Sequence, residues 1–146
     1  MDGSLKKALE PKSLRVAKAD VDPTQRQGGS LRALLTPASV GATDAFLGTV
    51  DLEPGQSVSE LYHPYSDKFL YVVDGEVDIR LNGEHVRLRT EESLMVRRGT
   101  RHRFECPEET EARLVFTIAP LAPRPELGHV DTEPVPHPEA GVPRVG

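Results

Sequence analysis

The stretch LYHPYSDKFLYVVDG, residues 61–75, predicts two strands that are joined by a short loop and followed by a turn. Pro64 disfavours the helical conformation for His63, so the chain is extended at this histidine. The run FLYVV after Lys68 has the apolar and β-branched character of a strand, and Asp74-Gly75 is a turn signal. This pattern places His63 and Lys68 where two adjacent strands face each other.

Alternation of apolar and polar residues continues after this stretch. Residues 76–81 alternate strictly, and Asn82-Gly83 is the strongest hairpin signal in the chain. In the strand before the stretch, Gly48 suggests a bulge or a close backbone approach. Strands are expected at 30–36, 42–52, 58–63, 68–73, 76–81, 84–89, 94–96, 101–106 and 112–119. Short strands without a long helical pattern predict an all-β, single-domain sandwich or small barrel.

The two ends of the chain differ from this central barrel, which we expect at 30–119. Residues 1–29 form an N-terminal arm, in which SLRVAKADV (13–21) is a candidate edge strand. Residues 120–146 hold seven of the 13 prolines, which excludes a helix or a central strand. We expect this tail to lie extended on the surface or to be disordered at its end.

The alternation also indicates which side chains point inward. His63 shares a face with the apolar Leu61, and His102, in RRGTRHRF (97–104), shares a face with Phe104 and Cys106. Two histidines from different strands therefore point into one interior, where each needs a hydrogen-bond partner or a metal. His85 lies on a polar face, and His129 and His137 lie in the tail, outside any predicted site.

Composition restricts the setting in which the protein works. The chain has 146 residues, one cysteine and a net charge of −5. No intramolecular disulfide is possible, which suits a reducing cytoplasm. The negative charge and the absence of tryptophan argue against nucleic-acid binding. No apolar run approaches the length of a membrane span, so we expect a soluble, cytoplasmic protein.

These residues have the spacing of the two sequence motifs of the cupin family. The first motif is represented by Gly55, Leu61, His63, Lys68 and Gly75. The second is represented by Glu92, Arg97-Arg98-Gly99, His102 and Cys106. The chain thus resembles a cupin, and the resemblance implies a double-stranded β-helix, or jelly-roll barrel.

Three stretches also resemble the small cupin cyclases of bacterial aromatic (type II) polyketide synthesis, of the tetracenomycin and spore-pigment types. They are RQGGSLRALLTPASVGAT, HPYSDKFLYVVDGEV and PLAPRPELGHVDTEP. The resemblance implies an enzyme of antibiotic biosynthesis, a polyketide cyclase. Such an enzyme performs an aldol-type cyclisation and dehydration on a poly-β-ketone intermediate.

The resemblance also implies a metal site, which is incomplete in this chain. The family's ligands are two histidines and a carboxylate of the first motif and the histidine of the second. His63 and His102 remain as ligands for a divalent metal, zinc or another transition metal, whereas Leu61 and Lys68 replace the other two. Without a metal, His63 or His102 can act as the general base. Lys68 can stabilise an enolate when protonated, act as a base when neutral, or simply reach water from a strand end.

Two alternatives to a cyclase stay open: a non-catalytic cupin that binds a polyketide intermediate or supports the synthase, and a metal-dependent cupin oxygenase or isomerase. The polyketide would be presented by an acyl carrier protein. Four arginines cluster around the second motif: Arg97, Arg98, Arg101 and Arg103. They can bind such an acidic partner, or they can form a solvated loop whose charge is balanced by Glu91, Glu92 and Glu105. Exposed edge strands, including those before Pro37, predict a homodimer.

Overall fold

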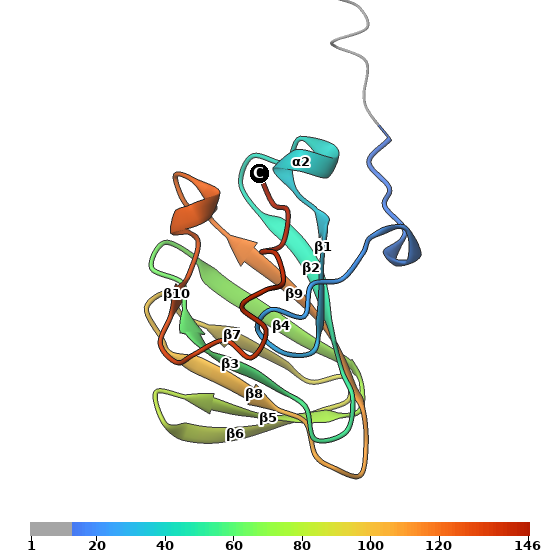
Figure 1. The fold of residues 1–146 in the computed structure, drawn as a ribbon, viewed down its shortest axis with the longest axis vertical. Helices are drawn as coiled ribbons and strands as arrows, with labels where there is room; N and C mark the ends of the chain where they lie inside the picture. Colours follow the sequence, from blue (N-terminus) through green and yellow to red (C-terminus); the bar gives the residue numbers. More distant parts are fainter. Residues whose placement is uncertain (1–12) are drawn as a thin grey trace, which may run out of the picture.

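Two antiparallel sheets of five strands pack face to face in the computed structural model, which describes residues 13–146 (Figure 1). The first sheet has the strand order β1-β2-β9-β4-β7, and the second has the order β10-β3-β8-β5-β6. The strands are β1 (Ser30–Leu35), β2 (Phe46–Leu52), β3 (Ser57–Tyr62), β4 (Asp67–Asp74), β5 (Glu76–Leu81), β6 (Glu84–Arg89), β7 (Ser93–Val96), β8 (His102–Glu105), β9 (Ala112–Ala119) and β10 (Val130–Asp131). The predicted all-β class is confirmed, and nine of these ten strands were expected.

The hydrophobic core lies between the two sheets, because alternate residues of each strand point inward. Val72, Val77 and Ile79 are completely buried, and Leu114 and Phe104 are 1% exposed. Full burial of a side chain of this size stabilises the fold by roughly 1.5–3 kcal/mol. Strand β9 lies at the centre of the first sheet, where it pairs with both β2 and β4.

The turns follow the local sequence. Asn82 and Gly83 have φ values of 47° and 89°, as the predicted type I′ turn requires. In the second cupin motif, Glu91 adopts the left-handed conformation at φ 66°. The first residue of this motif is a glycine in the family, and positive φ is the conformation that glycine adopts most easily. Glu91, which has that conformation, therefore occupies the first position of the motif. The assignment of that position to Glu92 is wrong by one residue.

Gly48 confirms the predicted close backbone approach. A Cβ atom at this position of β2 would lie 2.4 Å from the carbonyl oxygen of Arg32 and 2.6 Å from Cζ of Phe116. The pairing of β1 with β2 also shifts register between Ala33 and Leu35. Glycine therefore lets β1 and the Phe116 ring lie directly against β2.

The expected edge strand at 13–21 does not form, and residues 1–12 of the predicted arm lie outside the described residues. Lys18–Asp20 form a short 3-10 helix, η1, instead. Leu14 is 63% exposed, so this segment lacks the apolar burial that would hold a strand on the barrel. A second short helix, α2 (Pro37–Val40), was not predicted; it is capped by Thr36, whose hydroxyl accepts from the N–H of Ser39.

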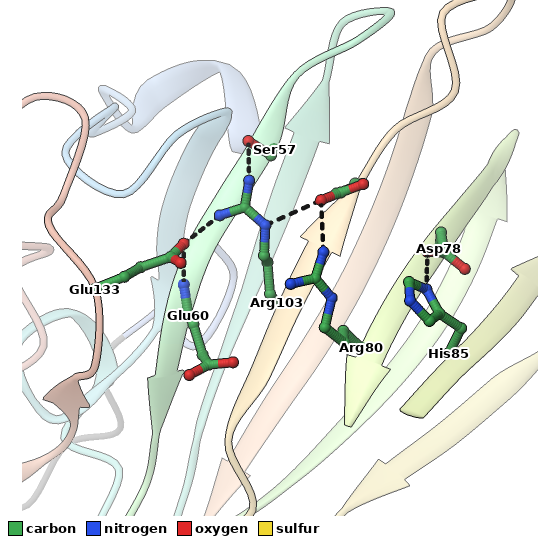
Figure 2. A network of polar contacts seen from close by, with 8 residues as sticks. Ser57, Glu60, Asp78, Arg80, His85, Arg103 and Glu133 are labelled. Carbon is green, nitrogen blue, oxygen red and sulfur yellow. Dashed lines mark hydrogen bonds and ion pairs between the residues drawn. The ribbon is translucent and has the colours of Figure 1, made fainter. Parts of the chain in front are cut away.

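The proline-rich tail returns to the barrel. After the 3-10 helix η2 (Pro125–Leu127), strand β10 adds to the edge of the second sheet by pairing Val130 with Tyr62. Figure 2 shows the Glu133 carboxylate beside β3 and β8, where it accepts hydrogen bonds from Arg103 and from the N–H of Glu60. The tail thus lies on the surface, as expected, and part of it forms an edge strand of the second sheet.

Further along the tail, the Arg26 guanidinium donates hydrogen bonds to the carbonyls of Pro138 (2.7 Å) and Ala140 (2.9 Å). The N-terminal loop and the tail therefore hold each other against the first sheet. Within residues 13–146 no helix is long and apolar enough to cross a membrane.

Candidate active site

Lys68 and His102 meet in the interior between the two sheets. Lys68 lies on β4, where it pairs with Val96 and Ile118, and His102 begins β8, where it pairs with Leu61. Lys68 Nζ is 3.4 Å from His102 Nε2. The two predicted residues therefore belong to one site, and the packing of the sheets sets the distance between them.

Lys68 is buried, so the interpretation as a lysine that reaches water is wrong. Only 6% of the residue is exposed. Its Nζ lies 5.0 Å from the centre of the Phe104 ring and 5.2 Å from that of Phe116, within the range of cation–π attraction. Burial lowers the pKa of Lys68 from 10.5 to about 8, because the ammonium is deprived of water. The amine is therefore much easier to deprotonate than that of an ordinary lysine.

His102 is 2% exposed and contacts Lys68 in the interior of the barrel. Its Nδ1 donates to the carbonyl of Thr100 at 2.9 Å, so Nε2 is free to accept a hydrogen bond from Lys68. Burial, followed by the nearby Lys68 charge, holds the pKa of His102 well below 6.5. The neutral imidazole thus orients the lysine amine.

His63 follows β3 and has one ring nitrogen without a partner. Its Nδ1 donates to the carbonyl of Gly128 at 3.0 Å, whereas its buried Nε2 makes no hydrogen bond to the described residues. Burial, and then the charge of Lys68, lower the pKa of His63 to about 3. The His63 and His102 rings are 5.5 Å apart between centroids. His63 therefore keeps a bare lone pair on Nε2 next to Lys68.

The tail brings His129 to this site, contrary to the expectation that this histidine lies outside it. The His129 ring centroid is 6.4 Å from that of His63. Its Nε2 is 3.1 Å from the amide nitrogen of Gln27, which also donates to Asp131. The stretch PLAPRPELGHVDTEP contains His129 and carried the subfamily resemblance, which was the available signal for its role.

A cavity of about 730 Å³ opens in front of His63 and Lys68. Its other walls are mostly apolar and come from the barrel and the tail, including Leu31, Phe46, Phe116, Ile118, Leu121, Val142 and Val145. A volume of this order accommodates a molecule of several fused or linked rings. A second hollow of about 670 Å³, between the N-terminal loop and residues 140–144, contains none of the predicted site residues.

The residues present do not fit the metal site of typical cupins. Leu61 is 3% exposed at one ligand position and has no donor atom. His102 Nε2 faces the Lys68 amine, and its Nδ1 is bonded to Thr100. Among residues 13–146 no group of three or more histidine, cysteine, aspartate or glutamate side chains is placed to hold a metal. A transition metal normally requires three or four such donors.

Comparisons with known proteins agree with this fold. The cupin domain family matches residues 48–118. The chain is 61% identical over 132 residues to the tetracenomycin polyketide synthase protein TcmJ of Streptomyces glaucescens, covering 90% of this chain and 89% of the relative. It is 50% identical to the polyketide synthase CurC of Streptomyces cyaneus, covering 78% and 74% of the two chains.

Among solved structures, the polyketide cyclase RemF of Streptomyces resistomycificus superposes with a TM-score of 0.66 at 19% identity, over 85% of this chain and 88% of that one. Pac13, a nucleoside dehydratase, superposes with a TM-score of 0.69 at 20% identity, over 90% and 100% of the two chains. Such distant likeness confirms the jelly-roll fold and leaves the chemistry open. The chain belongs to the cupin family, and within it to the group that includes the polyketide synthesis proteins TcmJ and CurC.

Proposed function

We propose that the protein is a polyketide cyclase that closes a ring in a poly-β-ketone by aldol addition and loss of water. The observation that carries this proposal is that His63, whose Nε2 has no hydrogen-bond partner among the described residues, and the buried Lys68 both line one large, mostly apolar cavity. The identity of 61% to TcmJ supports a polyketide as the substrate class.

His63 is the general base in this scheme. Its Nδ1 is held by Gly128, so Nε2 can accept a proton from a methylene group between two carbonyls. Lys68 donates a hydrogen bond to the oxygen on which negative charge develops, and the apolar walls keep water from competing. The protonated His63 returns its proton to the alkoxide that the aldol addition forms. His63 then removes the remaining proton of the former methylene carbon and gives it to the departing hydroxyl group, which leaves as water.

The low basicity of His63 changes during this step. The charge of Lys68 is the second cause of the lowered pKa of His63. An enolate oxygen next to Lys68 offsets that charge, and the pKa of His63 rises as the proton is transferred. The site therefore favours protonated His63 only when the substrate carries the negative charge of an enolate. This is differential stabilisation of the transition state.

The proposal is tested with the aromatic polyketide synthase reconstituted with this protein. His63→Gln and Lys68→Met are expected to lower the yield of the correctly cyclised product by about 100-fold, the usual contribution of a general acid or base. His85→Gln is the matched control, because His85 is exposed and pairs with Asp78 on the outer face (Figure 2). Unchanged products with both site variants would instead support a binding or scaffold role.

We further propose that the arginine loop after β7 receives the carrier protein. Arg97 and Arg101 are exposed, whereas Arg98 pairs with Asp67. The Gly99 N–H donates to the His63 carbonyl, so the loop adjoins the site. The double variant Arg97→Glu/Arg101→Glu should weaken binding of acyl carrier protein and reduce its salt dependence. Arg113→Glu, on β9, is the control, and equal binding by both variants would refute this docking surface.

The predicted homodimer has two candidate surfaces. Strand β1 is one edge of the first sheet, and Thr24 pairs with it at Leu31. An exposed apolar patch on the outer face of β4 and β7 is formed by Phe69, Tyr71, Val73 and Met95. Either surface is one that a second copy could cover. Sedimentation of the wild type and of Tyr71→Glu tests which of the two is used, since only pairing through the patch is sensitive to that substitution.

A further inference from the structure

Lys68 is a buried primary amine that has no acidic partner in the described part of the chain. Lys18, in contrast, lies 2.6 Å from the Asp51 carboxylate. Burial lowers the pKa of Lys68, and no carboxylate offsets this effect. A lysine that is retained inside a barrel without a counter-charge calls for a chemical explanation, because burying an unpaired ammonium destabilises the fold.

The surroundings of Lys68 favour nucleophilic chemistry. The amine lines the cavity of about 730 Å³, so a carbonyl compound in the cavity can reach Nζ. His102 Nε2 accepts one of its N–H bonds at 3.4 Å and leaves the nitrogen lone pair of the neutral amine available. With a pKa of about 8, roughly a tenth of the amine is neutral at pH 7. An ordinary lysine has a neutral fraction more than ~100-fold smaller at that pH.

We propose that Lys68 forms a Schiff base with a carbonyl carbon of a β-dicarbonyl substrate and activates the neighbouring carbon for ring closure. This inference rests on the proposed cyclase function and specifies how Lys68 serves it. Desolvated lysines of this kind are the ones that act as nucleophiles toward carbonyl compounds.

The covalent step proceeds as follows. Nζ attacks the carbonyl carbon, the C=O π electrons pass to oxygen, and a proton moves from nitrogen to that oxygen. A proton from solvent allows the hydroxyl to depart as water, which leaves an iminium C=N bond. His63 Nε2 takes a proton from the adjacent carbon, and the resulting enamine attacks a second carbonyl, whose alkoxide is protonated by His63. Water then hydrolyses the iminium, which releases the amine and a proton.

Covalent activation explains why so weak a base suffices. Burial and the charge of Lys68 lower the pKa of His63 to about 3, so His63 takes a carbon-bound proton more readily when the carbon is more acidic. An iminium withdraws electrons more strongly than a hydrogen-bonded carbonyl does, so it acidifies the adjacent carbon. The unpartnered Nε2 of His63 and the amine of Lys68, which line the same cavity, can therefore act in one reaction.

The experiment treats the wild-type protein with acetylacetone, a small β-diketone that converts an amine to a stable enaminone with loss of one water. Peptide mass mapping should find Lys68 increased by the mass of the probe less that of one water. The initial rate at Lys68 should be half-maximal near pH 8 and at least about tenfold above that at Lys18 at pH 7. Modification of Lys18 without modification of Lys68 would overturn the proposal.

The synthase assay separates the two proposals. If Lys68 is unreactive toward acetylacetone but Lys68→Met still loses the cyclised product, the Schiff base is refuted and the cyclase function stands. If Lys68 forms the adduct but the site variants leave the products unchanged, the reactive amine is established and the cyclase function fails.

Discussion

Lys68→Met is expected to make the protein more stable at neutral pH while removing its activity. The lowering of the Lys68 pKa from 10.5 to about 8 corresponds to roughly 3 kcal/mol of destabilisation of the charged form, at about 1.4 kcal/mol per tenfold change. Methionine is one heavy atom shorter than lysine and carries no charge, so it fills most of the space beside Phe104 and Phe116 without the cation–π attraction of Nζ. It leaves His102 Nε2 without a donor, which costs about 1–2 kcal/mol. The net gain is about 1–2 kcal/mol.

The pH dependence gives the sign of this effect. Below pH 8 the amine is protonated in both the folded and the unfolded wild type, so the full destabilisation is present. Between pH 8 and 10.5 the unfolded chain binds more protons than the folded one, and the stability of the wild type rises with pH. The advantage of Lys68→Met should therefore disappear by pH 10.

Urea unfolding of the wild type and the variant at pH 7 and pH 10 measures this difference. Tyrosine and cysteine also titrate in this range, but they do so in both proteins and cancel. Lys18→Met is the control, since that lysine forms a surface pair with Asp51 and should change stability by less than about 1 kcal/mol. A variant that is less stable than the wild type at pH 7, with no trend toward pH 10, would refute the reasoning.

Three further outcomes are expected. The wild type should lose stability as pH falls from 6.5 to 3, because the unfolded chain protonates His63 before the folded one does; His63→Gln should flatten this fall in urea unfolding at pH 7 and pH 4. Gly48→Ala should lower the free energy of unfolding by more than about 2 kcal/mol, because the new Cβ would overlap the carbonyl oxygen of Arg32 and the Phe116 ring. Gly141→Ala is the control: it has open space at its Cβ and should change the free energy of unfolding by less than about 0.5 kcal/mol. Equal midpoints of unfolding for the two variants would contradict this prediction. Removal of residues 142–146 should open the cavity and broaden the product mixture, because Val142 and Val145 line the cavity. The far-UV circular dichroism should stay unchanged, because these residues belong to no strand.

The strands and the inward direction of the site residues could be predicted because they depend on local alternation. Leu61 and His63 share a face, as do His102, Phe104 and Cys106, and the structure buries His102, Phe104 and Cys106 together. Whether Lys68 stays inside could not be decided in this way. Alternation gives the direction of its side chain, but not whether two aromatic rings from β8 and β9 lie beside the amine.

The tail was harder to predict, because its position depends on contacts far along the chain. Prolines exclude a central strand, and β10 is indeed an edge strand. Nothing local indicates that Glu133 will meet Arg103, or that Gln27 will meet His129. The position of His129 beside His63 depends on such long-range contacts, which the alternation pattern does not encode.

The return of the tail divides the site into two parts with different freedom to change in evolution. Lys68 and His102 lie on paired strands whose core neighbours restrict substitution. Residues of the tail that shape the cavity, such as Leu121, Val142 and Val145, are not part of the ladders of the sheets. If the protein is the cyclase that we propose, substitutions in the tail would change the shape of the cavity and leave Lys68 and His102 in place, so one barrel could be adapted to new carbon skeletons by changes at its end alone.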